Sequence, residues 1–136
     1  MKILLFGIAK DIVGNQFLED ASFKAKTVAE LKQELIQKYP DRIVNIHPSL
    51  LPSFRGSNAV KQALDSGVKI TGCSAHIVHE KVDTGPILIQ SAIPICNFDN
   101  EDSLLKKIQH QEHKILTIGV ALAAKAWRDK ILKGKK

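Results

Sequence analysis

Cysteines and long apolar runs are both scarce in this chain of 136 residues. Its two cysteines, Cys73 and Cys96, lack the Cys-x-x-Cys spacing of metal and redox sites, so we expect reduced thiols, and a disulfide is not indicated. The apolar run after Met1 is too short for a secretion signal, and no stretch approaches the ~20 apolar residues of a membrane span. These absences predict a cytoplasmic protein without a membrane partner.

Glycine-rich phosphate loops are missing as well. Neither Gly-x-Gly-x-x-Gly nor Gly-x-x-x-x-Gly-Lys occurs, so the sequence supports neither dinucleotide binding nor P-loop binding. The net charge of +6 suggests a nucleic-acid partner at first sight. However, residues 125–136 hold six cations and one anion, which leaves about +1 for the rest of the chain. The charge therefore indicates a solvated C-terminal tail, and nucleic acid is not an expected partner.

The stretch from Asn45 to Gly56 places an amide and an imidazole where a strand should end. Apolar residues at 43, 44 and 46 predict a short buried strand, and Pro48 biases His47 toward an extended conformation. Side chains two residues apart on a strand point to the same face, so Asn45 and His47 should present theirs together. Because open α/β sheets bind ligands at the carboxyl ends of their strands, this strand end is a candidate site.

A carboxylate that could orient the imidazole is found at Asp83, in a Val-Asp-Thr-Gly-Pro turn between two β-like runs. An amide can donate to a developing oxyanion, an imidazole can donate or carry a proton, and a carboxylate can keep the imidazole protonated and oriented. Asn45, His47 and Asp83 would therefore suit acyl transfer to a substrate that brings its own amine. Such chemistry requires no Ser or Cys nucleophile.

Three motifs in this order resemble one enzyme family. They are His-Pro-Ser-Leu-Leu-Pro-Ser-Phe-Arg-Gly from His47, Asp-Thr-Gly-Pro-Ile-Leu-Ile-Gln from Asp83, and Gln-His-Gln-Glu-His from Gln109. Together they are similar to the catalytic half of the glycinamide ribonucleotide (phosphoribosylglycinamide) formyltransferases, over about residues 42–127. Parts of the first two motifs also occur in methionyl-tRNA formyltransferases, but the helix motif favours the purine enzymes.

The resemblance implies a set of roles for individual residues. Asn45, His47 and Asp83 would be catalytic in formyl transfer from 10-formyltetrahydrofolate to glycinamide ribonucleotide. Gln109 and Glu112 would bind substrate, with Glu112 at the ribose hydroxyls. The co-substrate would be 10-formyltetrahydrofolate, and no metal would take part.

Residues 1–40 follow a different pattern. Residues 2–9 and 16–24 predict two strands joined by a turn, and Thr27 with Glu30 predicts a capping box before a helix that runs to residue 39. This order of elements resembles the N-terminal part of a β-grasp domain. The amino-acid sequence of the segment is similar to that of the small subunit of molybdopterin synthase. That family of sulfur carriers ends in Gly-Gly, whereas this chain ends in Lys-Gly-Lys-Lys, which argues against sulfur carriage. We interpret the chain as a chimera, engineered or natural.

The predicted fold class is α/β, as a single domain with a mixed sheet and helices. An N-terminal β-β-α of β-grasp type (1–40) would join the β-α-β-β-α half of a formyltransferase fold (41–128), followed by a basic tail (129–136). The strand that ends at His47 is expected to lie parallel to the strand of residues 2–9, with the intervening helix as a right-handed crossover.

Four further elements are predicted after the strand that ends at His47. They are a helix over 58–66, strands over 68–81 and 86–95, and a last helix capped by Asp99 or Asn100. The strand over 86–95 is apolar on both faces and is expected to be central.

The last helix should turn an apolar stripe toward the core, formed by Leu105, Ile108, Ile115, Gly119 and Leu122. Glu112 falls on this stripe, where a carboxylate is costly unless it is paired or faces a cleft. From the residues alone, a position at the edge of the helix is an equal alternative.

Four histidines other than His47 are present, and they lack a complete zinc-ligand motif, so surface or cleft positions are favoured for His76, His79, His110 and His113. Arg55 could meet an anion or simply face solvent.

For function, the first hypothesis is a folded chimera with the formyltransferase residues but little or no activity, because the phosphate-binding half of the family is missing. The alternatives are an active phosphoribosylglycinamide formyltransferase and a β-grasp binding module. Apolar sheet edges left without neighbours also predict self-association.

Overall fold

The computed structural model describes residues 2–4, 17–19, 24 and 26–133. The chain divides into two compact units, Met1–Pro40 and Asp41–Lys136, with the boundary where the two segments were expected to join. Each unit is described by itself. The expectation of one single domain stays a prediction, and the proposed turn at residues 14–15 lies outside the described residues.

The N-terminal unit has the predicted order of two strands and a helix. β1 (Lys2–Leu4) pairs antiparallel with β2 (Phe17–Glu19), and α2 spans Val28–Lys38. The Thr27 hydroxyl accepts a hydrogen bond from the Glu30 N–H at 3.1 Å, so this helix begins with the predicted cap. The Glu30 carboxylate in turn accepts from the Lys26 N–H at 2.7 Å. The β-grasp assignment of this unit stays a prediction.

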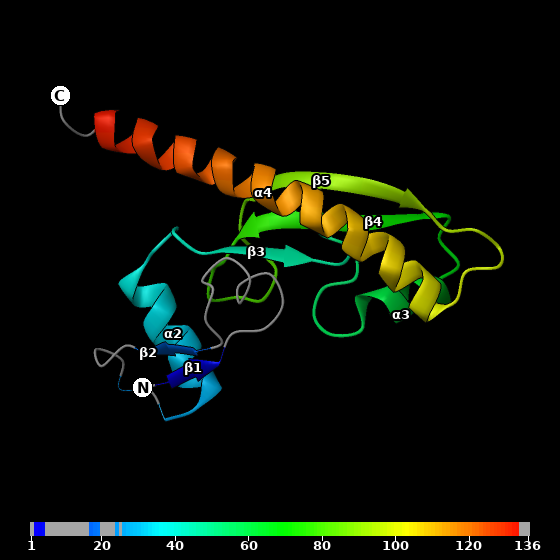
Figure 1. The fold of residues 1–136 in the computed structure, drawn as a ribbon, viewed down its shortest axis with the longest axis horizontal. Coiled ribbons are helices and arrows are strands. Elements are labelled where there is room, and N and C mark those ends of the chain that lie inside the picture. The colour runs from blue at the N-terminus through cyan, green and yellow to red at the C-terminus, as the bar shows by residue number, and fades with distance from the viewer. Residues whose placement is uncertain (1, 5–16, 20–23, 25, 134–136) are drawn as a thin grey trace. The chain divides into compact units, whose positions relative to one another are not determined.

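The C-terminal unit has the predicted β-α-β-β-α order. It consists of β3 (Val44–His47), α3 (Ala59–Asp65), β4 (Ile70–Ile77), β5 (Ile87–Pro94) and α4 (Glu101–Lys133). The strands form an antiparallel sheet in the order β3-β4-β5, and α4 lies across one face of it and extends past the strands (Figure 1). The Asn100 side chain accepts from the Ser103 N–H at 2.9 Å, so Asn100 is the cap of α4.

β1 pairs with β2 as expected, and the parallel alignment of β1 with the strand that ends at His47 stays a prediction. Two other expectations about the sheets were wrong for the described strands. The pairing is antiparallel in both sheets rather than mixed. The order also makes β4 the central strand and β5 an edge, although β5 had been expected to be central. Apolar content alone misled here, because an edge strand whose one face is covered by a long helix can be as apolar as a central one.

The core of the C-terminal unit lies between the sheet and α4. Cys73, Ala75 and Ile93 pack there with a stripe on α4 that contains Ile108 and Ile115. The stripe differs from the expected one at its far end and includes the buried Ala123, whereas Leu122 is exposed.

The helix approaches the sheet closely at Gly119. A Cβ built on this residue would lie 2.8 Å from the Ala75 Cβ, so a side chain there would force the two elements apart. The helix also continues through Lys133, so residues 129–133 of the predicted basic tail are helical.

Contacts at the C-terminal half of α4 tie it to the entry of β3. The Trp127 indole N–H donates to the Asp41 carbonyl at 2.6 Å, and the Arg42 guanidinium stacks 5.0 Å from the Trp127 ring centre. This anchor and the core contacts together fix α4 along the sheet that carries the candidate site.

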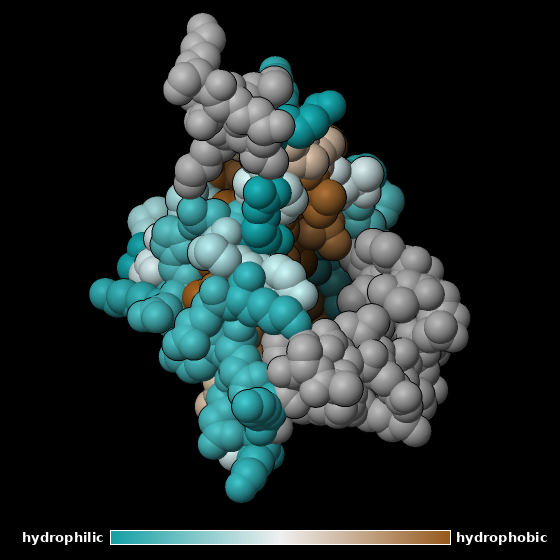
Figure 2. Space-filling model, turned by 90° about the vertical axis from the view of Figure 1, so that its left-hand side faces the viewer, coloured by the Kyte–Doolittle hydropathy of each residue, from teal (hydrophilic) through white to brown (hydrophobic). Residues whose placement is uncertain are grey.

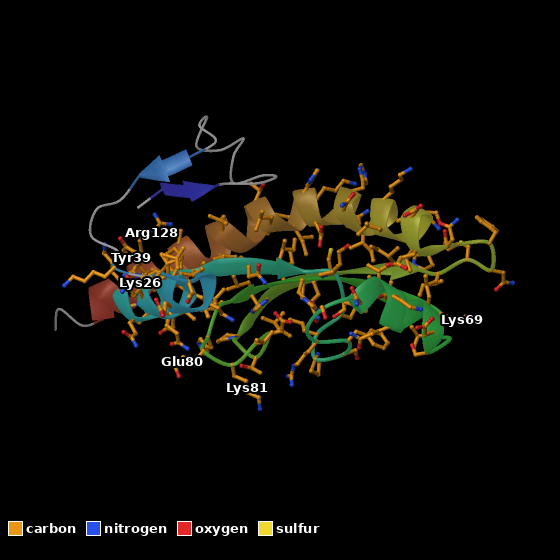
Figure 3. The ribbon with its side chains drawn as sticks, turned by 90° about the horizontal axis from the view of Figure 1, so that it is seen from below. Lys26, Tyr39, Lys69, Glu80, Lys81 and Arg128 are labelled. Carbon is orange, nitrogen blue, oxygen red and sulfur yellow. The ribbon has the colours of Figure 1, made fainter. Side chains whose placement is uncertain are left out.

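On the face seen in the space-filling view, hydrophilic side chains surround a narrow band of apolar ones (Figure 2). Charged residues lie at both ends of β4, with Lys69 before it and Glu80 and Lys81 after it (Figure 3). Within the described ranges, no helix is long and apolar enough to cross a membrane.

Two isoleucines of α4 provide a test of the core. Ile108 is fully buried and Ile118 is 48% exposed. We expect Ile108→Ala to lower the free energy of unfolding by about 2–5 kcal/mol, because the lost side chain leaves a cavity under the helix. Ile118→Ala should change it by no more than about 0.5 kcal/mol. Urea denaturation measures both, and similar losses in the two variants would contradict the described packing of α4.

Candidate active site

The end of β3 presents the two side chains expected there. Asn45 and His47 pair with His76 and Ser74 of β4, and these alternate positions face away from Ala75, which packs in the core. Asn45 is exposed, whereas His47 and His76 are almost fully buried. The Asn45 amide nitrogen lies 3.3 Å from His76 Nε2. The strand end therefore combines an accessible amide with two enclosed imidazoles.

The loop that follows β3 returns to the His47 ring. The Phe54 carbonyl lies 2.8 Å from His47 Nε2. Because a carbonyl oxygen can only accept, Nε2 is the nitrogen that carries the hydrogen, and Nδ1 is left to face Asp83. The loop thus determines which ring nitrogen meets the carboxylate.

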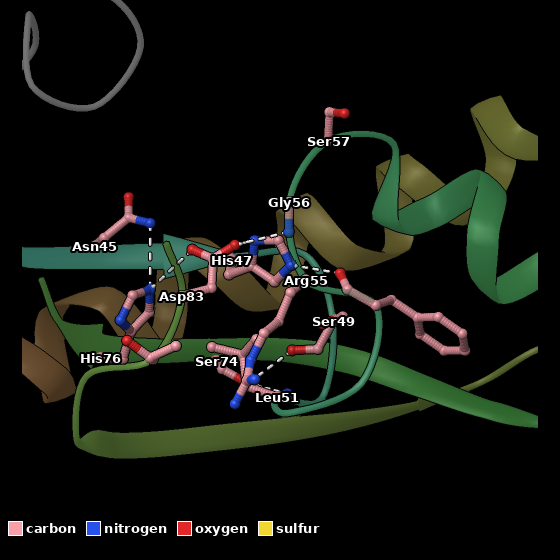
Figure 4. A network of polar contacts seen from close by, with 12 residues as sticks. Asn45, His47, Ser49, Leu51, Arg55, Gly56, Ser57, Ser74, His76 and Asp83 are labelled. Atoms are coloured by element: carbon pink, nitrogen blue, oxygen red, sulfur yellow. Dashed lines mark hydrogen bonds and ion pairs between the residues drawn. The ribbon is translucent and has the colours of Figure 1, made fainter. Parts of the chain in front are cut away.

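The Asp83 carboxylate lies between the two imidazoles (Figure 4). One oxygen is 3.4 Å from His47 Nδ1 and accepts the Gly56 N–H at 2.9 Å. The other oxygen is 3.6 Å from His76 Nε2. Asp83 joins residues that are distant in sequence, and its side chain is only 9% exposed. One carboxylate therefore connects the strand end, the following loop and β4.

The turn that holds Asp83 depends on a glycine. A Cβ on Gly85 would lie 1.8 Å from the Ile77 carbonyl oxygen, so no other residue fits without moving the backbone. The Ile77 N–H donates to the Pro86 carbonyl at 2.9 Å, which closes the turn onto the end of β4. Asp83 itself has a φ of 51°, a left-handed conformation that aspartate adopts more readily than most residues. These features explain the Asp-Thr-Gly-Pro motif physically.

His76 belongs to the cluster, although the sequence had placed it among surface or cleft histidines. Its Nδ1–H donates to the Ile77 carbonyl at 2.9 Å, so Nε2 faces Asn45 and Asp83. A signal was available in the sequence, because Ser74 and His76 are polar residues at alternate positions of a mainly apolar strand. The sequence does not reveal the register between β3 and β4, which places His76 opposite Asn45.

Glu112 is half-buried on α4 and interacts electrostatically with His47. Burial raises the pKa of its carboxyl above the usual range for a glutamate, and the charges of His113 and His47 partly offset this effect. Burial, together with the charge of Glu112, also raises the pKa of the Cys73 thiol to about 11, so this thiol is not a reactive group at neutral pH. Gln109, the other predicted substrate-binding residue, is exposed on the same helix.

Metal ligation has no support within the described part of the chain, where no group of three or more His, Cys, Asp or Glu side chains could hold an ion. Cys73 and Cys96 are free thiols. Arg55 is exposed in the loop after β3, and its carbonyl lies at the limit of hydrogen bonding with the Gln62 amide, 3.5 Å away.

Comparison with known proteins identifies the family. Residues 24–120 match the formyl transferase family. The chain belongs to that family. The match begins upstream of residue 42, where the motifs had placed the start of the resemblance, and so includes all of α2.

Several relatives have established names. The chain is 42% identical over 119 residues to the human trifunctional purine biosynthetic protein adenosine-3, which covers 88% of this chain and 12% of that protein. It is 49% identical over 80 residues to phosphoribosylglycinamide formyltransferase of Bacillus subtilis, covering 59% of this chain and 41% of that protein. The structure of the Anaplasma phagocytophilum phosphoribosylglycinamide formyltransferase is similar, with a TM-score of 0.65 at 44% identity, over 68% of this chain and 46% of that one. The chain therefore spans less than half the length of these proteins.

The raised pKa of Glu112 predicts a pH-dependent stability. The folded protein holds this proton more tightly than the unfolded chain, so the stabilisation is present below the usual glutamate range and is lost as the pH rises through the raised pKa. We expect Glu112→Gln to raise the melting temperature at about pH 8 and to change it little at about pH 4, where Glu112 is already protonated. Thermal melts measure both. Exposed Glu80→Gln serves as the control, and an equal effect of Glu112→Gln at both pH values would contradict the burial.

Proposed function

We propose that the cluster of Asn45, His47 and Asp83 catalyses formyl transfer from 10-formyltetrahydrofolate to the amine of glycinamide ribonucleotide. The observation that carries the proposal is the Asp83 carboxylate held between two imidazoles, with the Asn45 amide beside them. Membership of the formyl transferase family and the names of the relatives support this choice of substrates.

The proposed reaction uses the substrate amine as the nucleophile. The amine attacks the formyl carbon, a new C–N bond forms, and the carbonyl oxygen becomes an oxyanion. The intermediate then collapses, the bond from the formyl carbon to the folate nitrogen breaks, and a proton moves from the attacking amine to that nitrogen. The protein must therefore stabilise one negative oxygen and move one proton.

The geometry suits these two tasks. Asn45 is exposed at the strand end, and its amide can donate to the oxyanion. His47 has its Nε2–H held by the Phe54 carbonyl, and its Nδ1 lies 3.4 Å from the Asp83 carboxylate. A protonated His47 would add positive charge beside the oxyanion, and Asp83 would relay the proton from amine to folate nitrogen, through water.

The substrate contacts of α4 form a second part of the proposal. Glu112 is half-buried, and burial raises the pKa of its carboxyl, so hydroxyl groups of a ligand would offer the carboxylate hydrogen bonds that stabilise its charge. We assign it to the ribose hydroxyls of glycinamide ribonucleotide, with Gln109 as a further polar contact.

The extent of turnover by this chain is a separate question. The sequence has no glycine-rich loop for the substrate phosphate, and binding and orientation can supply ~7–11 kcal/mol toward a barrier. The proposal is therefore a site with formyl-transfer chemistry that turns over slowly in this chain. The chimeric origin with a segment like molybdopterin synthase, and the β-grasp binding function, stay predictions.

Self-association also stays a prediction, and β5 is the element that supports it. The strand is an edge of the described three-stranded sheet, carries no charged residue from Ile87 to Pro94, and leaves Ile87 44% exposed. Edge strands without charge are prone to pair with another chain.

Single-turnover formyl transfer with excess protein tests the proposed function. We expect slow product formation that His47→Ala reduces by about 100-fold or more, because the variant loses the imidazole that stabilises the oxyanion and orients Asp83. His79→Ala is the matched control, since His79 is an exposed histidine whose ring nitrogen lies 3.3 Å from the Asp41 carboxylate. Turnover that is the same in the wild type and His47→Ala, or absent in the wild type, would contradict the proposal.

A further inference from the structure

The position of the Phe54 carbonyl requires a strained backbone. Phe54 has a φ of 54°, in the left-handed region that a bulky side chain seldom adopts. Such a conformation persists only where surrounding contacts fix it. Since this carbonyl accepts the Nε2–H of His47, whatever fixes the loop also fixes the ring.

Ser74 of β4 is the first of these contacts. Its hydroxyl donates to the Ser49 carbonyl at 2.7 Å and accepts the Leu51 N–H at 3.0 Å. It also accepts an N–H of the Gln90 amide at 2.8 Å, which uses the full hydrogen-bonding capacity of a hydroxyl. Ser74 is completely buried, so water cannot replace any of these bonds.

Gln90 of β5 is the second contact. Its amide nitrogen donates to the Leu51 carbonyl at 3.0 Å as well as to Ser74, so both amide hydrogens hold the loop. Within the loop, the Ser49 hydroxyl donates to the Ser53 carbonyl at 2.5 Å, which carries the restraint to the residue before Phe54. A continuous chain of hydrogen bonds thus runs from β5 through the loop toward the His47 ring.

We infer that Gln90 is a positioning residue of the formyl-transfer site. It does not touch the reacting atoms. It holds the loop after β3 so that the Phe54 carbonyl keeps the proton on His47 Nε2 and turns Nδ1 toward Asp83. The inference rests on the proposed function for its kinetic consequence, but its structural consequence is measurable without turnover.

Two variants of Gln90 test the inference. Gln90→Met keeps the length of the side chain and removes both donors, and Gln90→Glu keeps the shape but presents a carboxylate to the Leu51 carbonyl. Gln37→Met is the matched control, because Gln37 is exposed on α2. In each protein the His47 imidazole N–H signals are recorded by NMR, and formyl transfer is measured under saturating and limiting substrate.

In the wild type and in Gln37→Met we expect a slowly exchanging Nε2–H signal from His47. Both Gln90 variants should lose it while the amide signals of β4 persist. We also expect kcat to fall by about tenfold or more, with KM changed less than about twofold. The reason is that a misplaced His47 ring stabilises the transition state less well but does not change how the substrate binds.

Retention of the His47 signal in both Gln90 variants would overturn the inference. A loss of the amide signals of β4 would also overturn it, because Gln90 would then stabilise the folded sheet as a whole instead of positioning the loop. A wild type without turnover would count against the proposed function alone, because the NMR result still decides the role of Gln90.

Discussion

The Asp83 carboxylate is the group on which the arrangement of the site depends. Its two oxygens face His47 on β3 and His76 on β4, and one of them also accepts the Gly56 N–H. A nearly buried carboxylate is costly unless it is well partnered, so the three partners must stay in place for the carboxylate to remain there. One charge thereby fixes two strands and a loop relative to one another.

The rest of the C-terminal unit supports that carboxylate. Gly85 permits the tight turn that presents Asp83, and the core beneath the sheet holds β3 and β4 in register. Gly119 lets α4 approach the sheet closely at Ala75 of β4. Packing and chemistry are therefore coupled, because the elements that form the core also carry the polar groups of the site.

Local patterns predicted much of this unit. Alternation on a strand placed Asn45 and His47 on one face, and caps and apolar spacing predicted α2, α3 and α4. The link to Asp83 came from family motifs, since no local rule joins residues so far apart. His76 and Gln90 were not predicted because their roles depend on strand register, and β5 was misplaced because apolar content does not distinguish an edge from a centre.

The central claim is that a single carboxylate lies between His47 and His76. The most direct test compares histidine ring signals by NMR in the wild type and in Asp83→Asn, with Asp65→Asn as a control because Asp65 pairs with Lys61 on the surface. The account predicts that the ring signals of both His47 and His76 move in Asp83→Asn, while the exposed His79, His110 and His113 keep theirs. A change in only one of the two rings, or in neither, would contradict it.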